Sequence, residues 1–145
     1  MAGRDSIAAG AIPPGGTLGI LGGGQLGRMT AIAAAELGYR VVVFCPESDP
    51  PAAQVASETI QADYDDRDAL DRFAERVDVV TIEFENIPVA ALDHLALKVP
   101  VRPGAQVLGV TQDRLIEKRF VRRVGGLTAP FAPVESMADL AAAIA

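Results

Sequence analysis

Short apolar stretches alternate with helically spaced apolar positions along the first part of the chain. Residues 17–22 and 40–45 have the pattern of strands that are buried on both faces of a sheet. The apolar positions between them have helical spacing, and they are Leu26, Met29, Ile32, Ala33 and Leu37. Gly38 ends this predicted helix just past its last turn. Residues 17–45 therefore form a predicted strand–helix–strand unit, whose short connections imply a right-handed crossover and a parallel sheet.

The same alternation continues to about residue 111. After a proline-rich loop over 46–57, further strands are predicted over 58–62, 78–82 and 98–102. Further helices are predicted after Asp66, from Pro88 to about Leu95, from Pro103 to about Val110, over 112–124 and after Ser136. The pattern predicts an α/β fold, a Rossmann-like parallel sheet of four or five strands with helices on both faces.

Composition and charge narrow the class of protein. Residues 1–16 are rich in Ala, Gly and Pro and predict a disordered leader, and the Rossmann-like domain is expected over 17–111. Half of the 145 residues are hydrophobic, yet no apolar run approaches the roughly 18 residues of a membrane span. The net charge of −6 argues against non-specific binding of nucleic acid. The single cysteine, Cys45, excludes an internal disulfide and is compatible with the cytoplasm.

A glycine-rich turn joins the first predicted strand to the first predicted helix. Gly22, Gly24 and Gly27 fit the pattern G-x-G-x-x-G. Glycines admit positive φ and the close approach of a ligand, and a helix N-terminus offers free N–H groups and partial positive charge. The turn alone is compatible with a dinucleotide site, with a site for another phosphate or sugar ligand, and with a packing turn. Glu47, just beyond the second strand, lies at about the distance from the glycines that an acid for the ribose of NAD requires, but Pro46 separates it from the strand and the fit is loose.

Two carboxylates follow the strand predicted over 78–82. Glu83 and Glu85 bracket Phe84, so in an extended segment both carboxylates point the same way. Because the carboxyl ends of parallel strands meet at one edge of a sheet, we expect these acids to share a cleft with the glycine turn. Such a pair accepts hydrogen bonds from ribose hydroxyls or amines, and a solvated strand end is the alternative.

The helix predicted over 112–124 is rich in cations. Arg114, Lys118 and Arg122 are spaced four residues apart and form one basic stripe. Acidic residues interleave with them, which is also typical of a solvated helix face. The sequence contains no Ser/His/Asp or Cys/His arrangement and no cluster of metal-ligating residues, so we predict no catalytic residue and no metal ligand in this chain.

Five segments together resemble one known family. They are GGGQLGRM (22–29), DPPAAQVA (49–56), TIEFENIP (81–88), QDRLIEKRF (112–120) and GLTAPFAPV (126–134). In this order they are similar to the N-terminal portion of N5-carboxyaminoimidazole ribonucleotide synthetase, the ATPase subunit of phosphoribosylaminoimidazole carboxylase, over residues 17–145. The family belongs to the ATP-grasp superfamily. The resemblance therefore implies a pre-ATP-grasp domain over 17–111, followed over 112–145 by a linker helix and the beginning of a truncated ATP-grasp domain.

The resemblance implies a ligase of purine biosynthesis. ATP and bicarbonate would give carboxyphosphate, and the amine of 5-aminoimidazole ribonucleotide would take up the carboxyl group, with Mg²⁺ bridging the ATP phosphates. The residues that the resemblance assigns to the ribonucleotide are Gly24, Gln25, Leu26 and Glu85, with Glu83 as the alternative acid for the ribose hydroxyls. It assigns Arg114 and Lys118 to ATP.

The ATP-grasp fold of this family continues well beyond the length of this chain and holds most ligands of ATP and Mg²⁺. We therefore expect the chain alone to bind ribonucleotide weakly and not to turn over, and the full-length family implies a homodimer. Two other functions stay open. One is the NAD(P)-binding Rossmann domain of an oxidoreductase, and the other is a non-catalytic nucleotide-sensing or structural domain.

Overall fold

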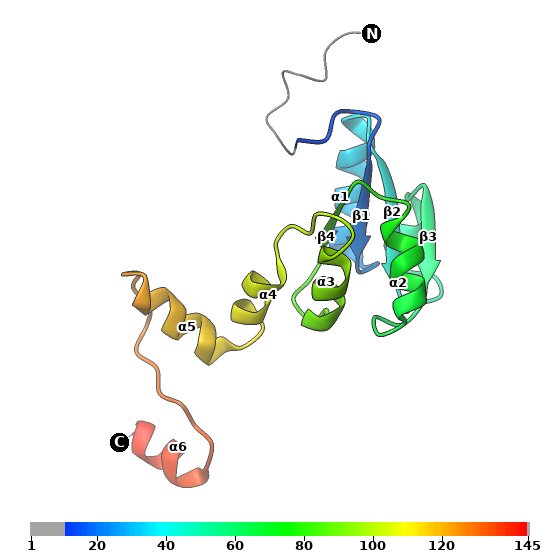
Figure 1. The fold of residues 1–145 in the computed structure, drawn as a ribbon. Helices are drawn as coiled ribbons and strands as arrows, with labels where there is room; N and C mark the ends of the chain where they lie inside the picture. The colour runs from blue at the N-terminus through cyan, green and yellow to red at the C-terminus, as the bar shows by residue number, and fades with distance from the viewer. Residues whose placement is uncertain (1–10, 145) are drawn as a thin grey trace. The chain divides into compact units, whose positions relative to one another are not determined.

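Four parallel strands form one sheet in the computed structural model, which describes residues 11–144. The strands are β1 (Thr17–Leu21), β2 (Arg40–Cys45), β3 (Glu58–Gln61) and β4 (Val79–Ile82). Their order is β3-β2-β1-β4, so β1 lies between β2 and β4 (Figure 1). Leu18 pairs with Val41 on one side and with Val79 on the other. The segments that follow β1 and β4 therefore leave the sheet side by side, at the same edge.

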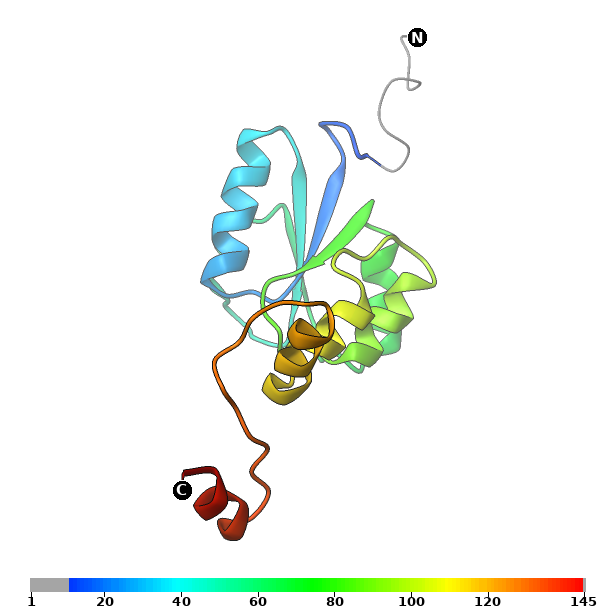
Figure 2. The ribbon, with the colours of Figure 1, turned by 90° about the vertical axis from the view of Figure 1, so that its left-hand side faces the viewer.

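Helices cover both faces of this sheet. The α-helices of the described residues are α1 (Gln25–Glu36), α2 (Arg67–Ala74), α3 (Val89–Ala96), α4 (Ala105–Thr111), α5 (Arg114–Arg123) and α6 (Met137–Ile144), and the chain also has a short 3-10 helix η2 (Pro51–Gln54). The helices on the sheet belong to the first part of the chain. α1 packs on one face of the sheet, and α2 and α3 pack on the other (Figure 2). Gly38 follows α1 with φ of +84°, the left-handed conformation that ends many helices at a glycine. The predicted α/β architecture is confirmed, with four strands.

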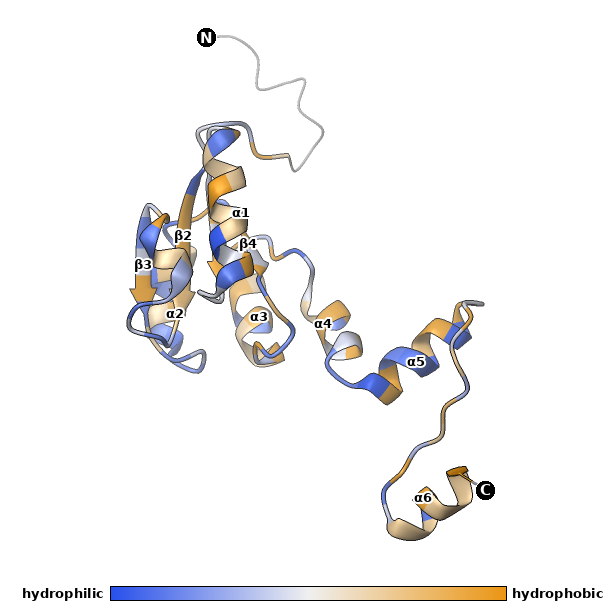
Figure 3. Ribbon diagram, turned by 180° about the vertical axis from the view of Figure 1, so that it is seen from behind, coloured by the Kyte–Doolittle hydropathy of each residue, from blue (hydrophilic) through white to orange (hydrophobic). Residues whose placement is uncertain are grey.

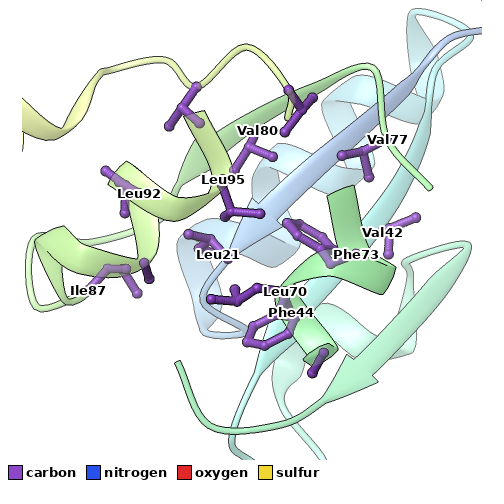
Figure 4. Packing of buried hydrophobic residues seen from close by; sticks show 14 of the residues in the cluster. Leu21, Val42, Phe44, Leu70, Phe73, Val77, Val80, Ile87, Leu92 and Leu95 are labelled. Atoms are coloured by element: carbon purple, nitrogen blue, oxygen red, sulfur yellow. The ribbon is translucent and has the colours of Figure 1, made fainter. Parts of the chain in front are cut away.

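Side chains of β2 alternate between two hydrophobic clusters. Val42 and Phe44 join the cluster beneath α2 and α3, whereas Val41 and Val43 join the cluster beneath α1. Phe44 packs against Phe73 of α2, with ring centroids 5.4 Å apart (Figure 4). Both faces of the strand are buried, which explains why the sequence of this strand is apolar at successive positions.

The chain divides into two compact units, with the boundary between Leu108 and Gly109, inside α4. In the second unit, the Asp113 carboxylate caps α5 by accepting the N–H groups of Leu115 and Ile116 at 2.9 and 2.8 Å. Hydrophilic and hydrophobic residues mix along α5, while α6 is mainly hydrophobic (Figure 3). Among the described residues, no helix has both the length and the apolar character that crossing a membrane requires.

The fifth predicted strand, over 98–102, is reduced to one bridge. Val101 pairs in parallel with Val80 of β4. Within the described residues this is a single bridge and not part of a longer ladder. Two hydrogen bonds make this bridge, from the Val80 N–H to the Pro100 carbonyl and from the Arg102 N–H to the Val80 carbonyl, each 2.8 Å long. The segment therefore borders β4 without extending the sheet.

The predicted disordered leader covers residues 1–16, of which residues 1–10 lie outside the described part of the chain. The described remainder differs from this prediction. The Tyr39 hydroxyl donates a hydrogen bond to the Ile12 carbonyl at 2.8 Å. The Gly15 N–H donates to the carbonyl of the glycine that ends α1, also at 2.8 Å. These bonds hold the segment just before β1 against the end of α1.

Candidate functional site

The glycine turn between β1 and α1 lies at the carboxyl edge of the sheet. Gly22 has φ of +106°, a conformation that side-chain-bearing residues rarely adopt. Its N–H donates to the Phe44 carbonyl at 2.9 Å. Gly24 is the N-cap of α1 and has no side chain with which to cap the helix. The first N–H groups of α1 therefore need an acceptor from elsewhere in the molecule.

The carboxylate of Glu83, directly after β4, supplies this acceptor. The Gly24 N–H donates to Glu83 Oε2 at 2.6 Å, and the Glu83 N–H donates to the Leu21 carbonyl at 3.0 Å. A Cβ on Gly22 or Gly27 would lie 2.8 or 3.0 Å from Oε2, and a Cβ on Gly24 would collide with Oε1. The three glycines of the motif thus make room for an internal carboxylate at a helix N-terminus, where negative charge is stabilised.

This arrangement bears on the dinucleotide alternative. In dinucleotide sites the pyrophosphate lies at the helix N-terminus, the position that the Glu83 carboxylate occupies in this chain. A pyrophosphate would meet a like charge there. Glu47, the acid predicted for the ribose of NAD, is exposed beyond β2. The geometry therefore favours a ligand that presents hydroxyls or amines to the turn over one that presents a pyrophosphate.

The proline-rich loop that contains η2 braces the turn from the other side. The Ala52 N–H donates to the Gly23 carbonyl at 2.9 Å. A Cβ on Gly23 would lie 2.8 Å from Cys45 Sγ and collide with Pro50. The Arg28 guanidinium of α1 donates to the carbonyl of the first η2 residue at 3.3 Å and to the side chain of Gln54. The sequence pattern did not predict this contact between the turn and the loop. The available signal was the run of three successive glycines, which leaves room for another segment such as the proline-rich loop.

The structure separates the sequence-predicted ribonucleotide residues. Gln25 and Leu26 lie in the first turn of α1 and are exposed, Leu26 to 58%. The segment 83–87 bends and turns, so the extended backbone behind the expected parallel orientation of the two acids is absent there. Glu83 is half-buried in the turn, whereas Glu85 is exposed. The acid that contacts the turn is thus Glu83, which the resemblance made the alternative.

Two groups with raised pKa lie at the same edge of the sheet. Burial raises the pKa of the Cys45 thiol to about 11, and the negative charge of Glu47 adds to the rise. Burial also raises the pKa of the Tyr64 hydroxyl, again with a contribution from Glu47. Both groups are therefore protonated at neutral pH. Within residues 11–144, no three His, Cys, Asp or Glu side chains group closely enough to hold a metal ion.

The predicted ATP residues lie in the second unit, around a hollow of about 290 Å³. Arg114 and Lys118 of α5 line it together with the segment 131–135. Lys118 Nζ lies 5.4 Å from the centre of the Phe131 ring, and Arg122 Cζ lies 4.3 Å from it. Two cations of the stripe predicted from the sequence, Lys118 and Arg122, therefore lie at one aromatic ring. The Arg114 guanidinium instead pairs with the Glu117 carboxylate. Cations beside an apolar wall suit a ligand with both phosphates and a planar ring.

Comparisons with known proteins agree with one another on the family to which the chain is similar. Residues 16–112 match the model of the ribonucleotide synthetase preATP-grasp domain. The chain is 53% identical over 133 residues to a bifunctional purine synthesis protein of Dictyostelium discoideum, a match that covers 92% of this chain and 13% of that protein. It is 48% identical over 133 residues to the N5-carboxyaminoimidazole ribonucleotide synthase of Brucella melitensis, covering 92% of this chain and 37% of that enzyme.

The chain is also similar in fold to a solved structure. It is the N5-carboxyaminoimidazole synthase of Aspergillus clavatus in complex with ADP and 5-aminoimidazole ribonucleotide. The match has a TM-score of 0.75 and 30% identity, and covers 89% of this chain and 35% of that one. The chain thus spans little more than a third of the length of these two synthases.

Proposed function

The chain belongs to the family of ribonucleotide synthetase preATP-grasp domains, and we propose that it is the ribonucleotide-binding portion of an ATP-dependent ligase of purine biosynthesis. The ligase would carboxylate 5-aminoimidazole ribonucleotide with bicarbonate, giving N5-carboxyaminoimidazole ribonucleotide, ADP and phosphate. The names and ligands of the matched proteins support this proposal. Because the chain spans about a third of the synthases, we expect it to bind ligand without turnover. A cytoplasmic location and a homodimeric full-length protein belong to the same proposal.

The single observation that carries the proposal is the Glu83 carboxylate inside the glycine turn. Oε2 holds the Gly24 N–H, and the other lone pairs of this carboxylate remain able to accept hydrogen bonds from sugar hydroxyls. A ribonucleotide would therefore place its sugar at the turn and its phosphate away from this negative charge. Gln25 and Leu26, exposed beside the turn, would contact the base or sugar, and Glu85 would serve as a second acceptor.

ATP would lie in the hollow beside Phe131. Arg114 and Lys118 would face its phosphates, and the apolar wall would pack against a planar ring. Magnesium bound to ATP would neutralise charge on the transferred phosphoryl group. The described residues hold no metal-ligating cluster that fits this ion, so we assign no step of the reaction to a metal held by this chain.

A binding titration tests the proposal. The 145-residue chain, labelled with ¹⁵N, is titrated separately with 5-aminoimidazole ribonucleotide and with NADH while amide shifts are recorded by NMR. We expect saturable shifts around the glycine turn with the ribonucleotide and none with NADH. Glu83→Gln keeps the size of the side chain and removes its charge, so affinity should fall roughly tenfold or more. Glu75→Gln, an exposed residue beyond α2, is the matched control and should bind as the parent chain does.

Two results would contradict the proposal. Saturable NADH binding that is lost in Glu47→Ala would favour the dinucleotide alternative. No saturable binding of either ligand would favour a structural or sensing domain. The expectation of binding without turnover is checked separately, because bicarbonate-dependent ATP hydrolysis by the purified chain would show that these residues suffice for catalysis.

A further inference from the structure

Tyr64 lies in the connection between β3 and α2, at the carboxyl edge of the sheet. The residue as a whole is half-buried, and its ring packs against Phe44 with the ring centroids 5.9 Å apart. The start of the connection is fixed to β2, because the Ala62 N–H donates to the Cys45 carbonyl at 3.2 Å. The position of the Tyr64 ring is thus set by two neighbouring strands.

The hydroxyl of Tyr64 is buried and has no hydrogen-bond partner within the described residues. Among the described residues, every other buried side-chain nitrogen or oxygen has a hydrogen-bond partner. Burying a hydroxyl without a partner opposes folding, and a phenylalanine would fill nearly the same space without that cost. Packing against Phe44 therefore explains the ring and leaves the hydroxyl without a structural role.

The hydroxyl lies at the same edge of the sheet as the acids that follow β2 and β4. Its pKa is raised first by burial and then by the negative charge of Glu47. The hydroxyl is therefore a neutral donor at the same edge of the sheet as the carboxylate in the glycine turn. A ligand that hydrogen-bonds that carboxylate brings acceptor atoms to the same edge of the sheet.

We propose that Tyr64 is a further binding residue of this edge, whose hydroxyl donates a hydrogen bond to an acceptor atom of the ribonucleotide held at the glycine turn. The inference rests on the proposed function and adds a residue to it. Tyr64 stands in a connection outside any regular helix or strand, and the residue as a whole is partly exposed. The proposed bond requires a small shift of this connection, which would expose the hydroxyl to an entering ligand. The bond absent from the free chain is then made in the complex.

The test uses two tyrosines of the same chain. In the free chain, Tyr64→Phe removes a hydroxyl that bonds to nothing, whereas Tyr39→Phe removes one that bonds to Ile12 at the opposite end of the sheet. We expect Tyr64→Phe to unfold in urea at the same concentration as the parent chain or a higher one, and to bind 5-aminoimidazole ribonucleotide roughly three- to tenfold more weakly. We expect Tyr39→Phe to unfold at a lower concentration and to bind with unchanged affinity.

The outcomes separate this inference from the proposed function. If the parent chain binds the ribonucleotide and Tyr64→Phe binds it equally well, the inference is wrong and the proposed function stands. If Tyr64→Phe lowers the urea midpoint as Tyr39→Phe does, the hydroxyl bonds within the free protein or to a trapped water, and the inference is again wrong. If the parent chain binds no ribonucleotide, the proposed function fails and the inference fails with it.

Discussion

Replacement of Glu83 by alanine tests the central feature of the site. The substitution removes the acceptor of the Gly24 N–H and the negative charge at the N-terminus of α1. Gly24 has no side chain that could take over the capping, so the N–H group would face a partly buried space without a partner. We therefore expect the free energy of unfolding to fall.

The magnitude follows from the two interactions that are lost. A hydrogen bond to a charged acceptor contributes about 1.5–3 kcal/mol. A charge at a helix terminus contributes about 0.3–1 kcal/mol. Together they predict that Glu83→Ala lowers the free energy of unfolding by about 2–4 kcal/mol. With a urea m-value of about 2 kcal/mol per molar, the midpoint would move by about 1–2 M.

Urea unfolding followed by far-UV circular dichroism measures this loss. Asp66→Ala is the matched comparison, because the Asp66 carboxylate caps α2 locally by accepting the Ala69 N–H at 2.9 Å. A cap of this local kind contributes about 1 kcal/mol. Glu83→Ala should therefore be the more destabilising of the two. A Glu83→Ala chain whose stability stays within about 0.5 kcal/mol of the parent would refute the capping role, since surface substitutions have effects of that size.

Three further predictions concern the fold around the site. A Cβ on Gly19 would lie 2.6 Å from Cζ of Phe73, so Gly19→Ala should cost about 1–3 kcal/mol of unfolding free energy in urea, and an unchanged midpoint would contradict this packing. Hydrogen bonds from Lys98 and then from His94 hold the pKa of Asp71 below its ordinary value. Asp71 therefore stabilises the chain above the ordinary aspartate pKa, and this contribution is lost as the pH falls through the lowered value. The stability gap between the parent and Asp71→Asn should be present at pH 6 and vanish in acid, and a gap independent of pH would contradict it. Because burial raises the pKa of Cys45 to about 11, thiol reagents should label it slowly in the native chain at pH 8 and rapidly in urea, whereas equal rates would contradict its burial.

The sheet could be predicted because its signals are local. Apolar runs mark β1 and β2, and Gly38 marks the end of the helix between them. The failure over 98–102 is also physical. The bonds to β4 are made by Pro100 and Arg102, and Pro100 has no N–H with which to extend the ladder ahead of the single bridge at Val101. The spacing of apolar residues does not register which donors are missing.

The site could be predicted only in part. The motif located the turn, since Gly22 and Gly24 lie at the carboxyl edge as expected. What fills the turn depends on the pairing of β4 with β1 and on the bend after β4, and no local pattern reports either. For the same reason the sequence did not distinguish Glu83 from Glu85, nor did it single out the buried hydroxyl of Tyr64. Contacts between distant segments decided each of these points.

The Glu83 carboxylate lies far along the chain from the glycine turn that it completes, and this distance predicts an order of folding. β1, α1 and β2 are consecutive and pair with one another, whereas the carboxylate that completes the N-terminus of α1 comes from 59 residues beyond Gly24. On a growing chain, β1, α1 and β2 can pack together while the Gly24 N–H still faces water. This N–H gains its acceptor when β4 docks beside β1 and brings Glu83 to the turn. We therefore expect the docking of β4 and the completion of the glycine turn to be one event, and an intermediate without β4 would have the three glycines of the motif without the Glu83 carboxylate.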